Sequence, residues 1–267
     1  MSKDIVTSLP SRLCIVFSLT FALAGCAGAR PELVQVRALA AEGSALNAFS
    51  ELSQRHLDSY RRSRPYLSPQ QDTQARLLAA QTRAAHADVT AIVQAIRLYL
   101  RALGQLARDD AFDLRKELAG AGSALRAWPD SGINDRHVTA YATLLGQLSR
   151  LAGRSSQQIQ LAQVLHDGDA PLQSLLEALD GLLRLYDKSG DNERDIVLGL
   201  LEIEIAYTDT PQQRLLTVLA SSLRQDKSEE YRLFGLRHTL ARKQLTLLAR
   251  EHGRLAMAIT NTPGAPP

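Results

Sequence analysis

The sequence predicts an all-α protein, an elongated bundle of about five to seven helices, and three observations carry this prediction. Ala, Leu, Arg and Gln are abundant in the composition, and all four are strong helix formers. β-branched residues are sparse and scattered, so a sheet would have little to build from. Between residues 70 and 107, apolar residues recur at alternating spacings of four and three, which is typical of a coiled-coil-like bundle helix.

We expect the first helix to begin at Pro31 and to run to about Arg62. Proline is favoured in the first turn of a helix, and Glu32 would lie near the positive end of the helix dipole. Pro65 and Pro69 then predict a turn, because each proline disfavours helical backbone in the residue before it.

The helix over 70–107 has the clearest pattern in the chain. Its seam consists of residues spaced alternately by four and three, namely Ala85, Val89, Ile92, Ile96, Tyr99, Leu103 and Leu106. Leu78, Val93 and Leu100 widen the stripe, which predicts contact with more than one neighbouring helix. At 1.5 Å per residue this helix would span about 57 Å, so we expect a rod.

Two shorter helices are predicted next. Asp109 and Asp110 have the character of N-caps and would open a helix that ends near Trp128-Pro129. Another helix begins after Asp135, and its apolar period continues to about Leu165.

The segment from His166 to Pro171 predicts a turn and a fresh helix start, because it contains both glycine and proline. The next helix is either broken or kinked at Ser189-Gly190-Asp191-Asn192 and then continues to about Tyr207. Residues 201–205 alternate as a strand does, but a lone strand would have no partner, so we assign them to the helix.

The last helix is predicted to start at Thr208-Asp209-Thr210-Pro211 and to end near Ile259, and residues 225–227 are the place where it would loosen. Residues 261–267 have the composition of a disordered tail. The chain has no fixed-period repeat and no Gly- or Ser-rich linker, which predicts one helical domain over 31–260.

The beginning of the chain has the pattern of an export signal. Lys3 and Arg12 outweigh Asp4, and Leu13–Leu23 is an apolar run of eleven residues, within the usual range for a signal core. A membrane-spanning helix needs about 20 apolar residues. Leu23-Ala24-Gly25-Cys26 then resembles a bacterial lipobox, the signal at which a cysteine is acylated and the chain is cut before it.

This resemblance implies a lipoprotein signal peptide over 1–25 and a lipidated Cys26 at the start of a short tether, 26–30. The protein would then contact a membrane through its lipid. Because Ala27 and not Asp follows the cysteine, the resemblance also implies the periplasmic face of the outer membrane. Two alternatives are a secretory signal cut at another site and an uncleaved anchor.

Processing would leave a chain without a free thiol, because Cys14 is removed and Cys26 is consumed. The net charge of that chain would be about +2, too close to neutral to indicate nucleic acid. The sequences Tyr99-Leu100-Arg101-Ala102-Leu103-Gly104 and Leu248-Ala249-Arg250-Glu251-His252-Gly253 resemble helical bacterial lipoproteins of unknown activity. That resemblance supplies no catalytic residues.

Motifs of enzymes are missing from the sequence: it has no G-x-S-x-G, no H-E-x-x-H and no phosphate-binding glycine loop. We therefore expect no catalytic activity and no cofactor, and we expect an adaptor or scaffold that binds another envelope component. The alternative is a periplasmic enzyme or small-molecule binder with a site between helices near His238 or His252.

His238 and His252 both fall on the apolar seam of the last helix. One hypothesis is a proton-sensing or metal-binding pair, since histidine changes charge near neutral pH. The two residues lie about 21 Å apart along a helix and cannot share one ion. Buried, hydrogen-bonded histidines are the simpler interpretation.

The densest basic patch consists of Arg55, Arg61, Arg62 and Arg64, interleaved with Tyr60 and Tyr66. It is either a contact for an anion or a partner, or a solvated helix end whose cations face the negative end of the dipole. The second interpretation is simpler, but this patch is the first interaction surface to mutate.

Two groups of acids do not predict a metal site. Asp167 and Asp169 follow His166 in what we interpret as a capped turn. The second group lacks the spacing of a calcium loop and is interpreted as a solvated helix end; it consists of Asp187, Asp191, Glu193 and Asp195.

Overall fold

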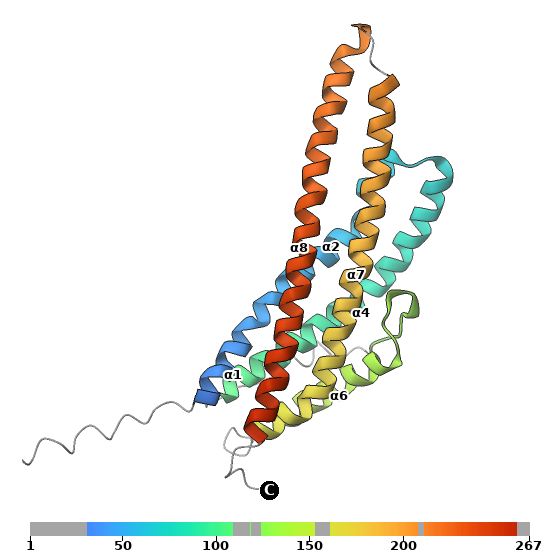
Figure 1. Cartoon of the computed structure of the whole chain (residues 1–267). Helices are drawn as coiled ribbons and strands as arrows, with labels where there is room; N and C mark the ends of the chain where they lie inside the picture. Colours follow the sequence, from blue (N-terminus) through green and yellow to red (C-terminus); the bar gives the residue numbers. More distant parts are fainter. Residues whose placement is uncertain (1–30, 109–117, 119–123, 153–160, 208–210, 261–267) are drawn as a thin grey trace, which may run out of the picture.

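The structure of the chain, a computed structural model, describes residues 31–108, 118, 124–152, 161–207 and 211–260. Regular structure in these ranges is helical throughout, which confirms the all-α prediction (Figure 1). Cys26, the predicted signal peptide and the predicted tail over 261–267 lie outside the described residues, as do the predicted caps Asp109 and Asp110.

The predicted first helix is divided into shorter pieces: α1 (Pro31–Ala41), η1 (Glu42–Ser44), α2 (Ala45–Leu57) and α3 (Ser59–Ser63). The first break coincides with Gly43 and Ser44, which are weaker helix formers than alanine, and the backbone tightens there into a 3-10 turn. The second break is at Asp58, whose carboxylate accepts a hydrogen bond from Gln54 Nε2 (3.2 Å). The predicted turn at the prolines is present as η2 (Arg64–Tyr66).

Helix α4 (Pro69–Leu106) confirms the predicted helix over 70–107. A capping box starts it, because Ser68 Oγ accepts from the backbone of Gln71 and Gln71 Oε1 accepts from the backbone of Ser68. The seam from Ala85 to Leu103 is buried. Leu78 differs from the prediction, since it is 59% exposed and lies beyond the part of α4 that the core covers.

The last residues of the helix predicted to end near Trp128 are not helical, since residues 124–127 have no regular structure. Trp128 instead forms an isolated antiparallel bridge with Ile133. Gly132 closes the loop between them with a φ of 82°, a conformation that glycine adopts without strain. The Trp128 indole donates to Asp88 Oδ2 of α4 (2.6 Å), which fixes the loop on that helix. Helix α6 (Asp135–Ala152) then begins where predicted but ends before Leu165.

Helix α7 (Leu161–Tyr207) contradicts the predicted turn at His166–Pro171, because it runs through this segment without a break. Pro171 has no N–H to donate, so the carbonyl of Asp167 lacks its helical partner. Gln147 of α6 supplies the missing donor, with its Nε2 2.5 Å from the Asp167 oxygen. A contact from another helix therefore stabilises a proline that would otherwise end this one.

Helix α8 (Arg214–Thr260) follows η5 (Pro211–Gln213) and is also continuous, so no loosening occurs at 225–227. The assignment of residues 201–205 to a helix is confirmed, and Ser189-Gly190-Asp191-Asn192 does not break α7. Helices α7 and α8 pack against each other as an antiparallel hairpin that forms the spine of the molecule (Figure 1).

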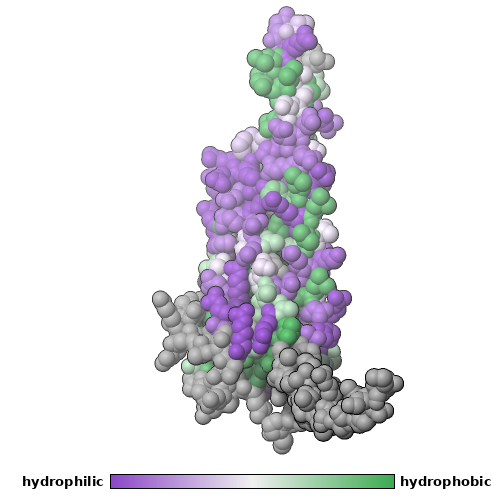
Figure 2. Space-filling view, turned by 90° about the vertical axis from the view of Figure 1, so that its left-hand side faces the viewer, coloured by the Kyte–Doolittle hydropathy of each residue, from purple (hydrophilic) through white to green (hydrophobic). Residues whose placement is uncertain are grey.

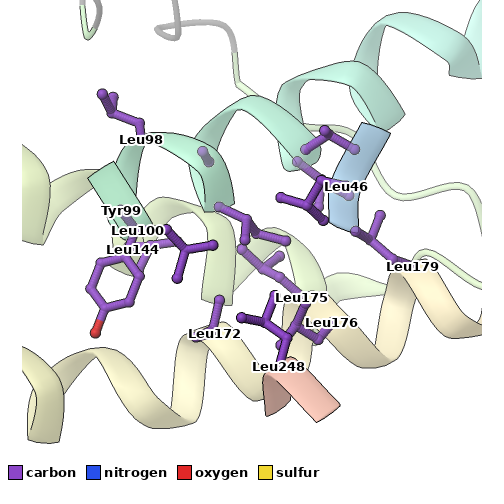
Figure 3. Packing of buried hydrophobic residues seen from close by; sticks show 14 of the residues in the cluster. Leu46, Leu98, Tyr99, Leu100, Leu144, Leu172, Leu175, Leu176, Leu179 and Leu248 are labelled. Carbon is purple, nitrogen blue, oxygen red and sulfur yellow. The ribbon is translucent and has the colours of Figure 1, made fainter. Parts of the chain in front are cut away.

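The core lies along one half of this hairpin, where the other helices cover it. Figure 3 shows leucines from five helices converging there: Leu46 of α2, Leu100 of α4, Leu144 of α6, Leu172 of α7 and Leu248 of α8. Each is at most 2% exposed. No helix within the described ranges is both long and apolar enough to cross a membrane.

The other end of the hairpin extends beyond the remaining helices (Figure 1). We call this part the arm; it comprises residues 202–207 of α7 and residues 211–226 of η5 and α8. None of the described residues in the arm is buried. Seven of them are large apolar residues between 38% and 79% exposed: Ile203, Tyr207, Leu215, Leu216, Val218, Leu219 and Leu223. Figure 2 shows hydrophobic surface gathered near this end.

Candidate functional site

The structure separates the four arginines of the predicted basic patch. Arg55 and Arg62 point into the bundle, whereas Arg61 and Arg64 are exposed. The Arg61 side chain is 79% exposed, and its Nη2 lies 3.6 Å from Asp58 Oδ1. Only half of the patch is therefore available as a surface for a partner.

Arg55 joins α2 to α8. Its Nη1 lies 2.8 Å from Glu230 Oε1, and its guanidinium carbon lies 3.6 Å from the centre of the Phe234 ring. A planar cation over an aromatic face combines charge with dispersion, so Arg55 acts as a packing residue as well as an ion-pair partner.

Arg62 joins α3 to α7 through a bidentate contact with Glu193, with distances of 3.0 and 2.9 Å. Glu193 is only 5% exposed, and it also accepts a hydrogen bond from Tyr231 Oη of α8 (3.2 Å). The prediction of a solvated helix end is therefore wrong for Glu193, because α7 continues past it and directs it between two other helices. Burial and the neighbouring carboxylate raise the pKa of Tyr231.

Two histidines complete this polar cluster. His56 stacks on Tyr186 with ring centres 4.3 Å apart, and His238 lies on the buried side of α8, as predicted. Burial, followed by the charge of Arg62, lowers the pKa of His56 to about 4. Burial also lowers the pKa of His238, so both rings are neutral at pH 7.

His238 Nδ1 is buried without a hydrogen-bond partner among the described residues, and His238 is one of the residues that line a narrow cleft of about 40 Å³. That volume holds a few water molecules and no larger ligand. Nowhere in the described ranges do three or more His, Cys, Asp or Glu side chains gather as metal ligands would. The cluster is thus equipped to hold α2, α3, α7 and α8 together by fixed ion pairs.

The second predicted histidine, His252, belongs to a separate network. Its Nε2 lies 2.8 Å from Tyr99 Oη of α4, and its Nδ1 lies 2.8 Å from Asp169 Oδ1 of α7. Burial lowers the pKa of His252, so the ring is neutral and carries one N–H. Asp169 can only accept, so it receives that N–H, and Tyr99 donates to the other nitrogen.

The order carboxylate, imidazole, hydroxyl has the form of a catalytic relay, but its surroundings oppose that role. Tyr99 is fully buried, and its phenol also lies 3.2 Å from the carbonyl of Val164. A Cβ atom on Gly168 would lie only 2.1 Å from this phenol, so the ring is packed directly against α7. Burial raises the pKa of Tyr99, which keeps it protonated. The network fastens α4, α7 and α8.

A larger cavity of about 210 Å³ lies between α4, α7 and η3 (Pro129–Ser131). Its lining is mainly apolar and includes Leu78, Val89, Trp128, Leu182 and Leu185. No sequence pattern predicts this cavity as a whole, and its one signal is Leu78, an apolar residue on the stripe of α4 that the core does not cover.

No protein-family model matches this chain, and neither the curated proteins nor the solved structures include a match to it.

Proposed function

We propose that the protein is a lipid-anchored adaptor of the cell envelope, held at the periplasmic face of the outer membrane through Cys26, and that its arm binds another envelope protein. The observation that carries this proposal is the exposed apolar surface of the arm. Monomeric proteins rarely expose contiguous apolar patches of large area, and such patches usually mark interaction sites.

The position of the arm supports this role. Arg254 of α8 donates to Gln35 of α1 (3.1 Å), so the beginning of the helical domain lies beside the last turns of α8. Leu219 precedes Arg254 by 35 residues along one continuous helix, a separation of about 52 Å. An anchor at Cys26 would therefore hold the arm tens of ångströms from the membrane surface.

The chemistry of the arm indicates the kind of partner. Two helices packed side by side cannot bury apolar residues that face away from each other, and none of the other helices that the structure describes lies beside the arm (Figure 1). An amphipathic helix of the partner would cover these side chains by ridge-into-groove packing. The seven apolar residues of the arm then become the centre of a small helical bundle.

Site-specific crosslinking in cells tests the proposal. A benzophenone amino acid at Leu219 should capture one reproducible envelope protein, whereas the same probe at the exposed Arg61 of α3 should not. Capture of a second copy of this chain would contradict the adaptor function and assign the arm to self-association. The anchor is tested separately, because Cys26→Ser should abolish acylation and processing.

A second candidate, a binder of small apolar molecules, is favoured by the 210 Å³ cavity rather than by either histidine. Its size and apolar lining fit a compact hydrophobic ligand. Filling it with Ala85→Phe should then abolish ligand-induced thermal stabilisation while crosslinking through the arm is retained. Retained stabilisation by the same ligand would exclude this cavity.

A further inference from the structure

An open groove with a volume of about 500 Å³ lies between the α1–α2 segment and the second half of α4. It shares no lining residue with the polar cluster, the His252 network or the arm. Four arginines line it, namely Arg37, Arg97, Arg101 and Arg108. Its other lining residues are mostly short: Ala40, Ala41, Gly43, Ser44, Asn47, Gly104 and Gln105.

Neutral groups hold two of these arginines in place. Arg37 donates through Nε and Nη2 to the carbonyl of Ala107, at 3.0 and 2.8 Å. Arg97 donates through Nη2 to Asn47 Oδ1 at 2.8 Å and to Ser50 Oγ at 3.2 Å. These contacts orient the guanidinium groups without neutralising their charge, and each group keeps further N–H donors for a ligand.

Two arginines of the groove differ from those of the polar cluster in their ion pairing. Arg55 and Arg62 are paired with Glu230 and Glu193, whereas no carboxylate of the described residues forms an ion pair with Arg37 or Arg97. Arg37 and Arg97 therefore bring positive charge to the groove that no carboxylate of the described residues neutralises.

Close packing of α1 on α4 shapes the floor. A Cβ atom on Gly104 would lie 2.8 Å from the Cβ of Ala40, so only glycine permits this approach. The short side chains leave an open floor beneath the longer arginines. An anion in the groove would thus meet several guanidinium groups at once.

We propose that this groove binds the phosphate group of an anionic phospholipid in the membrane that carries the anchor. The inference rests on the proposed anchor at Cys26, because Pro31 of α1 is five residues further along and within about 17 Å of it even if the chain is extended. Guanidinium groups match phosphate oxygens in bidentate geometry. Basic residues close to a membrane surface are attracted to anionic lipids.

Vesicle sedimentation tests the proposal on residues 26–267 carrying Cys26→Ser, a chain that retains every buried residue the structure describes. The protein should sediment with phosphatidylglycerol-containing vesicles and not with pure phosphatidylcholine vesicles. Arg97→Gln/Arg108→Gln should weaken binding about tenfold or more. The matched control, Arg61→Gln/Arg64→Gln, removes the same charge from exposed arginines of α3 and η2 and should leave binding within about twofold of the unmodified chain. Thermal unfolding of each variant shows that the fold is retained.

Three results would overturn the proposal. Equal weakening by both double variants would show attraction to net charge rather than recognition in the groove. Binding of inorganic phosphate in calorimetry without binding to vesicles would assign the groove to a free phosphate. If neither vesicles nor inorganic phosphate bound, the groove would not be an anion-binding site. If the proposed anchor were wrong, the result would instead appear in cells, where Cys26→Ser would be processed in the same way as the unmodified chain.

Discussion

The two ends of the α7–α8 hairpin are built from the same two helices, yet they bury their side chains very differently. Near the base, leucines of both helices are covered by α2, α4 and α6. In the arm, leucines of the same kind are exposed because no other described helix covers them. Helix formation along the hairpin therefore follows from local sequence, whereas burial depends on the neighbours that other parts of the chain supply.

The largest effect should come from a matched pair of leucines on α8. Leu248→Ala, at a position only 2% exposed, should lower the free energy of unfolding by about 2–5 kcal/mol, because it leaves a cavity in the core. Leu219→Ala in the arm should change it by less than about 0.5 kcal/mol. Chemical denaturation measures both, and similar losses would show that the arm is packed in solution.

The next effect concerns pH and the polar cluster beside the core. His56 has a pKa of about 4 in the folded protein, against 6.5 when unfolded, so the unfolded chain binds more protons between these values. Stability should therefore be complete above pH 6.5 and fall by up to about 3 kcal/mol as the pH decreases toward 4. Thermal melts over this range should show a weaker dependence in His56→Phe, with the remainder due to His238 and His252, and an unchanged slope in that variant would contradict the assignment.

A pair of glycines on α7 sharpens the comparison further. Gly168→Ala should cost about 1–3 kcal/mol, because the new methyl group overlaps the Tyr99 phenol. Gly190→Ala has open space around it and should stabilise the helix by about 0.5–1 kcal/mol. We expect Gly168→Ala to lower the melting temperature and Gly190→Ala to raise it. If Gly168→Ala left the melting temperature unchanged, Tyr99 would have to pack elsewhere.

The smallest effect on stability is expected from Leu215→Glu/Leu216→Glu in the arm, a change of less than about 0.5 kcal/mol per site. The same variant should abolish crosslinking to the partner, because charged side chains would be buried in the interface. Retained crosslinking with this variant would place the partner elsewhere on the molecule.

Patterns that depend on a single helix were predictable from the sequence. The spacing of α4 placed Val89, Ile92 and Ile96 in the core, and the same rule placed His238 and His252 on the buried side of α8. The helical assignment of residues 201–205 held for the same reason, since no second strand was available to pair with them.

Features that depend on two distant segments were not predictable. Pro171 remains helical only because Gln147 donates to the carbonyl that proline leaves unpaired. Arg62 is directed inward only because Glu193 lies opposite it, 131 residues further along the chain. Neither contact can be inferred from the sequence of a single helix. The sequence therefore favoured a turn at Pro171 and a solvated helix end at Glu193.

Helix α7 is uninterrupted through Pro171 and past Ser189, so the hairpin can transmit a force along its length as a rigid element. A sideways force applied to the arm cannot be absorbed by a hinge in α7, so it is transmitted to the base. There the short link from Tyr99 through His252 to Asp169 ties both helices of the hairpin to α4. A displacement of a partner bound to the arm would therefore act on the ion pairs of Arg55 with Glu230 and of Arg62 with Glu193, which lie nearer the arm, and beyond them on these hydrogen bonds.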